Sequence, residues 1–460
     1  MLIKLALPPG LYRNGTAYQS MGRWYDANLI RFFEGQIRPM KGWATGMTGT
    51  LSGNPRAAHA WYRNTGTSFA AYATHTKLYA HDGTTLDDIT HASFTPGGAD
   101  TSTWSLDNFG ELLIATNSEE KIMYEWQPGG GGDATIITNA PSALASFVTD
   151  ERIIVAIGSD GNPRNVAWCD QDARTTWTST ATNQAGDLNL TTKGVGMCGG
   201  RVRGGGLIWT TDDLHLMRYI GYPDIYGIER VGNDCGIISR HAFSILDSKA
   251  FWMGLNSFYV WAGYVETLPC DVGDDVFTNI NQTHRGKVWT LHNPQFGEVF
   301  WFYPRGAATE CSHYVSFNYR ENHWNHGTLA RNAGFSQGVW SYPVMVNAAG
   351  AMLWHEYGWS YDSANRYAIS GPVELGDGEQ RLQIDEIIPD EVTQGDCEAY
   401  FYTRAYPNAT EATLGPYNAA DRVGVITTAR QARVEIRSES ATNDFRIGNW
   451  RVKVKQRGRY

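Results

Sequence analysis

The sequence contains few charged residues and no long apolar run. Only 18% of its 460 residues are Asp, Glu, Lys or Arg, residue types on which long surface helices depend. No apolar run approaches the roughly 18 residues of a membrane-spanning helix, and the apolar start, 1–7, is too short for a secretory signal. Gly (50), Tyr (24), Trp (17) and Phe (17) are abundant instead, which favours strands and tight turns. We therefore expect a mainly β protein without a membrane span.

Closely spaced cysteine pairs are also missing. The six cysteines are spread singly along the chain as Cys169, Cys198, Cys235, Cys270, Cys311 and Cys397. We interpret them as thiols in a reducing compartment, with disulfides as the alternative, because a chain of this length needs no disulfide staples. The nearest approach to a metal site, Cys311 with His313, His323 and His326, fits no zinc spacing. No metal or other cofactor is expected.

The motifs of common enzyme classes are absent as well. The sequence has no Walker A motif, no GxSxG, no HExxH and no GxGxxG that follows a strand. Two carboxylate pairs, Asp212–Asp213 and Asp274–Asp275, could serve a glycosidase. Adjacent residues on a strand point to opposite faces, however, so neither pair forms a site by itself. We expect these acids to be solvated turn residues and the protein not to be an enzyme.

What the sequence does contain is a repeated hairpin pattern. Seven copies of an apolar strand, a short turn and an aromatic-rich strand occur at Ala70–Ala80, Glu111–Trp126, Arg152–Trp168, Leu207–Tyr219, Ala250–Trp261, Glu298–Tyr319 and Val344–Tyr357. Their apolar anchor positions lie 40 to 53 residues apart, which is typical of β-propeller blades. A large irregular β-sandwich with coincidental spacing is the alternative. We predict a β-propeller-like body of about six to seven blades.

Composition divides the chain into three parts. Residues 1–50 stand outside the repeat and suggest an extended N-terminal arm or platform. Residues 51–364 form the propeller-like body. From residue 365 onward, alternating runs such as Cys397–Thr403 and Trp450–Val454 predict a C-terminal antiparallel β-sandwich over 365–460.

The charge is unevenly distributed along the chain. The net charge is −9, yet the last 15 residues carry no acid and six cations: Arg446, Arg451, Lys453, Lys455, Arg457 and Arg459. Between 451 and 457 the cations alternate with Val452 and Val454, so one sheet face should be basic. This face is either simply solvated or a docking surface for another subunit or partner. Since the whole chain is acidic, we expect subunit or partner docking rather than DNA affinity.

Several segments resemble, in order, the tail proteins of short-tailed bacteriophages. Near the N-terminus these are Pro8–Gly10, Arg13–Thr16, Gly22–Asp26 and Ile37–Pro39. Further along the chain they are Trp104–Glu111, Trp177–Thr178, Thr182–Gly186, Leu207–Thr210, Tyr219–Gly221 with Pro223, Pro269–Val272, Trp301–Pro304, Ile388–Asp390, Gly415–Tyr417 and Arg446–Gly448. Each motif is weak alone, and the resemblance rests on their order over nearly the whole chain.

This resemblance implies a tail nozzle or tail-tube protein, also described as a packaged-DNA-stabilising or head-completion protein. Such proteins contain β-propellers and assemble as a ring, a homohexamer, below the portal and adaptor. Its partners would be other copies, adaptor or portal-side proteins, tail fibres or spikes, and double-stranded DNA passing through without sequence-specific binding. The location would be the virion tail, after assembly in the bacterial cytoplasm. No functional residue is carried over from the family.

A function of another class remains open. The propeller could bind or cleave carbohydrate for receptor engagement, with Trp340 and Trp359 stacking on sugars.

Overall fold

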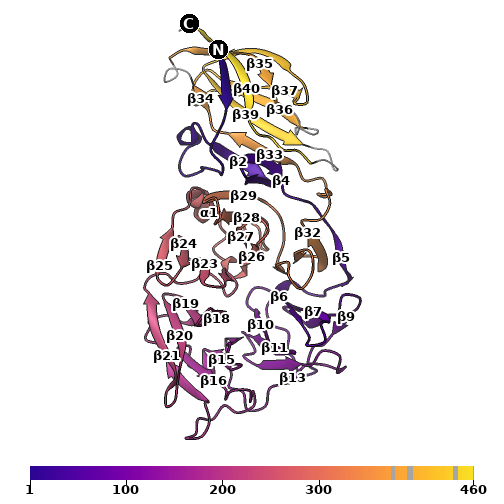
Figure 1. Cartoon of the computed structure of the whole chain (residues 1–460), viewed down its shortest axis with the longest axis vertical. Helices are drawn as coiled ribbons and strands as arrows, with labels where there is room; N and C mark the ends of the chain where they lie inside the picture. The colour runs from indigo at the N-terminus through magenta and orange to yellow at the C-terminus, as the bar shows by residue number, and fades with distance from the viewer. Residues whose placement is uncertain (375–378, 391–396, 439–443, 459–460) are drawn as a thin grey trace.

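The computed structural model describes residues 1–374, 379–390, 397–438 and 444–458. Figure 1 shows two bodies along the long axis, a ring of small sheets at one end and a β-sandwich at the other. The N-terminus lies at the far end of the sandwich. No helix of the described residues is long and apolar enough to cross a membrane. The mainly β fold predicted from composition is confirmed.

The ring is a propeller whose blades are four-stranded antiparallel sheets, seven of them in the described residues. Blade one comprises β6 (Pro55–Tyr62), β7 (Ser68–Thr74), β8 (Leu78–His81) and β9 (Leu86–Asp88), and blade two comprises β10 (Trp104–Phe109), β11 (Leu112–Asn117), β12 (Met123–Trp126) and β13 (Thr135–Ile136). Blade three comprises β14 (Ala145–Val148), β15 (Ile154–Ile157), β16 (Asn165–Trp168) and β17 (Gly186–Asn189), and blade four comprises β18 (Gly196–Val202), β19 (Gly205–Thr210), β20 (Leu214–Gly221) and β21 (Ile225–Gly232).

Blades five to seven complete the ring. Blade five comprises β22 (Phe243–Leu246), β23 (Lys249–Met253), β24 (Phe258–Trp261) and β25 (Val265–Leu268). Blade six comprises β26 (Trp289–Asn293), β27 (Glu298–Tyr303), β28 (His313–Asn318) and β29 (His323–Thr328). Blade seven comprises β30 (Ala333–Phe335), β31 (Val344–Val346), β32 (Ala351–His355) and β5 (Trp43–Thr50). The first strand of each blade contacts the first strand of the next, and β30 contacts β6 to close the circle. Short helices lie in the connections: η1 (Ala17–Ser20), η2 (Ser159–Gly161), α1 (Gly273–Asn279) and η3 (Arg285–Lys287).

The repeated hairpins are confirmed blade by blade. In every blade the predicted hairpin corresponds to the second and third strands, from β7–β8 in blade one to β31–β32 in blade seven. These middle strands are the most apolar: Ile154–Ile157 and Glu298–Tyr303 are buried along their full length. A strand with neighbours on both sides and blades on both faces buries both of its faces, which explains the strong signal in the sequence.

The sandwich consists of two sheets with strands from both ends of the chain. One sheet has the order β1 (Leu2–Leu5), β40 (Trp450–Arg457), β35 (Arg381–Ile388) and β38 (Val423–Ala429). The other has β2 (Trp24–Asn28), β33 (Arg366–Ser370), β39 (Gln431–Ser438), β36 (Glu398–Arg404) and β37 (Ala412–Asn418), with β34 (Val373–Glu374) also paired to β39. The antiparallel sandwich expected after residue 365 is therefore present.

The N-terminal 50 residues do not form the separate arm that we expected. β1 pairs with β40 and β2 with β33, so both belong to the sandwich. β5 pairs with β32 and supplies the fourth strand of blade seven. Strand pairing across hundreds of residues has no counterpart in the local pattern, which is why the segment looked independent.

A hairpin of β3 (Ile30–Phe33) and β4 (Gln36–Pro39) lies between the two bodies (Figure 1). One apolar cluster runs without interruption from blade five, through Trp301 and Trp324 of blade six and Phe32 of the hairpin, to Trp450 of the sandwich. Because this apolar surface is shared, the propeller and the sandwich are packed as one unit rather than joined by a linker.

Candidate functional site

The basic strand predicted at the C-terminus is β40, and its alternation is confirmed. Arg451, Lys453 and Lys455 are exposed, whereas Val452 and Val454 are buried between the two sheets of the sandwich. Arg457 is also exposed. Arg446 precedes the strand and forms an ion pair with Asp444 at 3.5 Å. Arg459 lies outside the described residues.

Part of the positive charge on this face is neutralised by β35. Lys455 contacts Asp385 at 2.7 Å, and Lys453 lies 3.9 Å from Glu386. The hydrogen bond from Lys455 lowers the pKa of Asp385. Sequence reasoning missed these acids because only the strand register places them opposite the lysines.

The charge of Arg451 is not neutralised by an ion pair with a described carboxylate. Its neighbour in register on β1 is Lys4, and neither residue forms an ion pair with any described carboxylate. We define the basic face as Lys4, Arg381, Arg451, Lys453, Lys455 and Arg457, all exposed on one sheet. Whether it docks a partner stays a prediction.

A second polar site fixes the N-terminal segment to blade six. Arg13 forms ion pairs with Asp26 at 2.8 Å and with Asp275 of α1 at 3.2 Å. Arg305 donates hydrogen bonds from Nη1 and Nη2 to the two carboxylate oxygens of Asp275, at 2.6 and 2.8 Å. His326 of β29 lies 2.9 Å from Asp26. We name these five residues the arm cluster.

The charges of the arm cluster compensate one another. Burial alone would raise the pKa of Asp26 and Asp275, but hydrogen bonds and the nearby cations outweigh it and lower both. The expectation that the pairs Asp212–Asp213 and Asp274–Asp275 are solvated is wrong for Asp213 and Asp275. Asp213 is 3% exposed and accepts a hydrogen bond from Thr192 at 2.8 Å. Asp274 and Asp275 lie on a helix, and their partners hold them in structural roles.

Backbone contacts near the arm cluster join segments that are distant in sequence. The amide of Arg13 donates to the carbonyl of Asp271, and the side chain of Asn14 donates to the carbonyl of Cys270, both at 2.7 Å. Gly10 has φ +85, and a side-chain carbon there would lie 2.6 Å from Cβ of His323. Arg13–Thr16 and Gly22–Asp26 thus meet Pro269–Val272 at one junction, and Gly10 packs against His323 of blade six.

A third polar site lies deeper, where the β3–β4 hairpin meets the propeller. Arg31 is 1% exposed and contacts Glu298 at 2.8 Å and Glu356 at 2.5 Å. Asn293 donates to Glu356 at 3.0 Å. Burial raises the pKa of Glu298 in spite of the guanidinium. A single cation therefore pairs with two buried carboxyl groups and binds the hairpin to blades six and seven.

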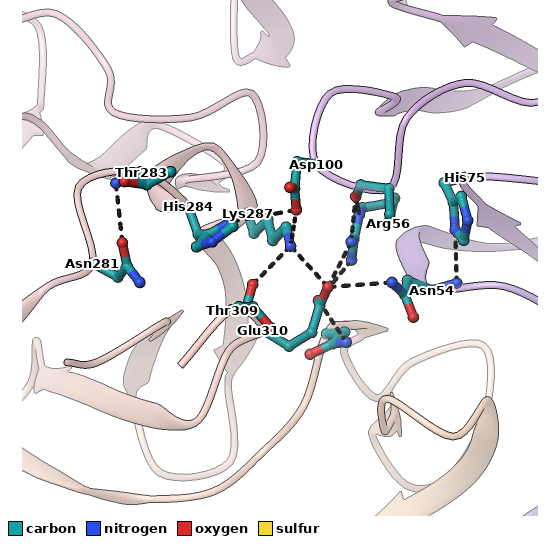
Figure 2. A network of polar contacts seen from close by, with 12 residues as sticks. Asn54, Arg56, His75, Asp100, Asn281, Thr283, His284, Lys287, Thr309 and Glu310 are labelled. Carbon is teal, nitrogen blue, oxygen red and sulfur yellow. Dashed lines mark hydrogen bonds and ion pairs between the residues drawn. The ribbon is translucent and has the colours of Figure 1, made fainter. Parts of the chain in front are cut away.

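A fourth polar network includes Arg56, which also lines a small cavity at the first strands of the propeller blades. Figure 2 shows Glu310, from the β27–β28 connection, between Lys287 and Arg56. Glu310 contacts both cations at 2.8 Å, and Lys287 also pairs with Asp100 of the β9–β10 connection. Burial opposes ionisation of Glu310, but Arg56 and Lys287 lower its pKa overall. The network ties blade one to blade six.

The first strands of four blades enclose a small cavity. The cavity between the first strands of blades five, six, seven and one has a volume of about 130 Å³. Arg56, His241, Trp289 and Thr290 are among its lining residues. This space accommodates a few water-sized groups, not a polymer.

The cysteines and histidines do not gather in one cluster in the described part of the chain. Among the described residues, no group of three or more His, Cys, Asp and Glu side chains could hold a metal ion. Cys311 donates to the carbonyl of Lys287 at 3.2 Å, while His326 belongs to the arm cluster. All six cysteines are free thiols, and five of them are buried.

The chain matches no protein-family model and no curated protein. Among solved structures it is similar to the β-propeller domain of Cps50 (Swd1) from Myceliophteria thermophila, at 8% identity and TM-score 0.41, over 67% of this chain and 98% of that one. Streptogramin B lyase is similar at 9% identity and TM-score 0.42, over 68% of this chain and 96% of that one. Hsv2 from Kluyveromyces lactis is similar at 8% identity and TM-score 0.36, over 71% of this chain and 95% of that one. These similarities concern fold alone.

Proposed function

We propose that the protein is a structural subunit of a bacteriophage tail. Copies of it would form the nozzle or tube ring that conducts and retains packaged DNA below the portal–adaptor complex and takes part in ejection. The observation that carries the proposal is the junction at the arm cluster. Segments that resemble tail nozzle proteins converge there, and their polar side chains are used to hold the arm, propeller and sandwich together.

In this proposal the DNA passes between copies of the chain and not through a propeller. The cavity at the first strands of blades five, six, seven and one has room for a few water-sized groups, and Arg56 at its edge is held in a network with Glu310 and Lys287. A duplex cannot enter such a space. A passage of sufficient width therefore requires several subunits around a common axis.

The distribution of charge is consistent with this arrangement. Each phosphate neutralised by Lys or Arg adds affinity that would retard moving DNA. A chain with net charge −9 suits a passage with low affinity for DNA. The basic face, on the exposed side of one sheet of the sandwich, would then contact a neighbouring subunit instead of lining the passage.

The carbohydrate-binding alternative gains no support from its two tryptophans. Trp340 is half-buried and packs on Phe335, with ring centres 5.6 Å apart. Trp359 is half-buried too and lies beneath the ammonium of Lys41, 6.0 Å from it. A sugar-stacking platform needs an open ring face. Binding of host surface polysaccharide that is lost in Trp340→Ala or Trp359→Ala would revive this alternative.

The proposal is tested by immunogold electron microscopy of particles of the encoding phage, with antibody against the recombinant chain. Label at the single tail vertex is expected. Label on peripheral fibres would instead favour receptor binding. Protein that is free in the lysate, with no label on intact particles, would overturn the proposal.

The docking role of the basic face has its own test. Arg451→Glu reverses a charge that has no carboxylate partner among the described residues, so the monomer should keep its melting temperature. The same variant should fail to form rings in light scattering and negative-stain images. Lys193→Glu is the control, because Lys193 is exposed on the propeller and likewise forms no ion pair with a described carboxylate. Normal rings from Arg451→Glu would contradict this role.

A further inference from the structure

A cleft of about 400 Å³ lies at the outer strands of blade three. Its lining residues come from β16 and the start of β17, from the connection between β13 and β14, from η2 and from the loop between β16 and β17. Those with a carboxylate, amide or hydroxyl side chain are Asn139, Asp160, Asn165, Thr178, Ser179 and Asp187. None of them belongs to the polar networks described above. A volume of this size is typical of sites for small organic molecules.

The apolar part of the cleft is supplied by Trp177. This residue is half-buried, packs on the apolar core around blade three and lines the cleft as well. Its Nε1 donates to the carbonyl of Arg174 at 2.8 Å, which holds the ring in place. The other half-buried tryptophans, Trp340, Trp354 and Trp359, each pack on an aromatic ring or a lysine. Among the described residues no ring or cation stacks on Trp177, so its surface is available to a ligand in the cleft.

The two carboxylates of the cleft, Asp160 and Asp187, form no ion pair with any described cation. Both side chains are exposed, and the described lining residues include no Lys, Arg or His. In the amide orientation that satisfies both of its polar atoms, Asn165 donates to Asp187 at 3.2 Å and accepts from Ser159 at 2.8 Å. A carboxylate has about four acceptor positions, so this bond leaves most of the capacity of Asp187 unused. The cleft therefore offers hydrogen-bond acceptors and negative charge beside an apolar ring.

No third His, Cys, Asp or Glu joins these acids to form a group that could hold a metal ion in the described part of the chain. We propose instead that the cleft binds an uncharged saccharide. Its carboxylates accept hydrogen bonds from sugar hydroxyls, and the indole of Trp177 packs on the C–H bonds of the sugar ring. An acidic sugar is repelled by Asp160 and Asp187. The inference does not depend on the proposed tail function, and its site is separate from Trp340 and Trp359.

Saturation-transfer NMR of the whole chain at pH 7 tests the proposal. The probes are four neutral sugars, maltose, lactose, L-rhamnose and methyl α-mannoside, with glucuronate as the acidic counterpart. We expect the wild type to bind at least one neutral sugar with a millimolar or lower Kd. Glucuronate should bind roughly tenfold more weakly than that sugar, or not at all. Binding of none of the four neutral sugars would overturn the proposal, and so would an equal affinity for glucuronate.

Asp187→Asn removes one charge from the cleft at nearly unchanged volume. The loss of a hydrogen bond to a charged acceptor should weaken sugar binding roughly tenfold. Asp87→Asn is the matched control, because Asp87 is also exposed, forms no ion pair with a described cation and lies on β9, the fourth strand of blade one. It lies opposite Ala80, just as Asp187 lies opposite Ala167. The control should bind sugar like the wild type.

Trp177→Ala should abolish the saturation transfer. Trp340→Ala is its control, because that half-buried ring packs on Phe335 and lies outside the cleft, so this variant should keep the signal. Melting temperatures establish that each variant is folded, and the pair Asp187→Asn and Asp87→Asn decides alone if Trp177→Ala does not fold. Wild-type affinity in Asp187→Asn, or in a folded Trp177→Ala, would overturn the proposal. Labelling of particles tests the tail function separately from this binding.

Discussion

Replacement of Arg31 by methionine should greatly weaken the attachment of the sandwich to the propeller. The arginine side chain is 2% exposed and lies between Glu298 and Glu356, at 2.8 and 2.5 Å. Methionine roughly keeps the volume but leaves both carboxylates buried without a cation. Removal of one partner from a buried ion pair costs about 3–5 kcal/mol. We expect a loss in that range from the free energy of unfolding at pH 7.

The loss should depend on pH, and its sign follows from the direction of the shift. The pKa of Glu298 is raised in the folded wild type because burial outweighs Arg31. Without the guanidinium the folded-state pKa rises further. A carboxyl with a raised folded pKa contributes stability below its unfolded pKa, and this contribution is lost as pH rises through the folded value. Arg31→Met should therefore lose least stability in mild acid and most at neutral pH.

Urea unfolding followed by tryptophan fluorescence at pH 5 and pH 7 measures both effects. The control is the triple variant Arg31→Met, Glu298→Gln, Glu356→Gln, in which no charge remains to be compensated. It should regain at least half of the lost stability. A loss below about 1 kcal/mol at pH 7, far from the range expected for a broken buried pair, would refute the reasoning. An equal loss at both pH values would refute the electrostatic explanation.

Three further outcomes are expected. Gly10→Ala should lower the free energy of unfolding in urea by about 2–3 kcal/mol, since strain at its positive φ adds to the clash with His323. Gly22→Ala, with φ +75 and no atom within 4 Å of the added carbon, should lower it by about 1 kcal/mol. Equal losses in the two variants would contradict the clash. Because the pKa values of Asp26, Asp275 and Glu310 are lowered, these carboxylates stabilise the fold above about pH 4, and this stability is lost as pH falls. Asp275→Asn should therefore reduce the fall of the melting temperature on the acid side of its pH profile. A profile equal to that of the wild type would contradict this expectation. All six thiols should react with Ellman's reagent in urea but only slowly in the native protein, because five are buried; rapid reaction of more than one native thiol would contradict this packing.

The sequence allowed the middle of each blade to be predicted, but not its edges. The second and third strands carry continuous apolar runs, such as Ile154–Ile157. First strands crowd around the axis and contain small residues, as at Ala57 and Ala58 or Gly199 and Gly200, so their apolar signal is weak. Outer strands such as β9 and β13 are short and largely exposed. Only the propeller as a whole identifies these edge strands.

In the candidate sites too, local patterns could be predicted from the sequence, whereas contacts between distant segments could not. The alternation of Arg451, Lys453 and Lys455 with valines is local, and the structure has it as expected. The partners Asp385 and Glu386 come from β35, more than 60 residues earlier. The arm cluster combines Arg13 with Asp275 and Arg305. Such long-range pairs depend on tertiary structure and leave no periodic signal in the sequence.

The pairing of β1 with β40 bears on the order in which the chain acquires its structure during translation. The amino group of Met1 donates to the carbonyl of Val454 at 2.6 Å, across 453 positions. The propeller can close on the ribosome once β32 has emerged, because β5 is already present. β1 is made before the other described strands and must wait for β40, the last of them. Until then the apolar faces of Ile3 and Leu5 lack their final cover, so a nascent chain stalled before residue 450 should be prone to aggregate.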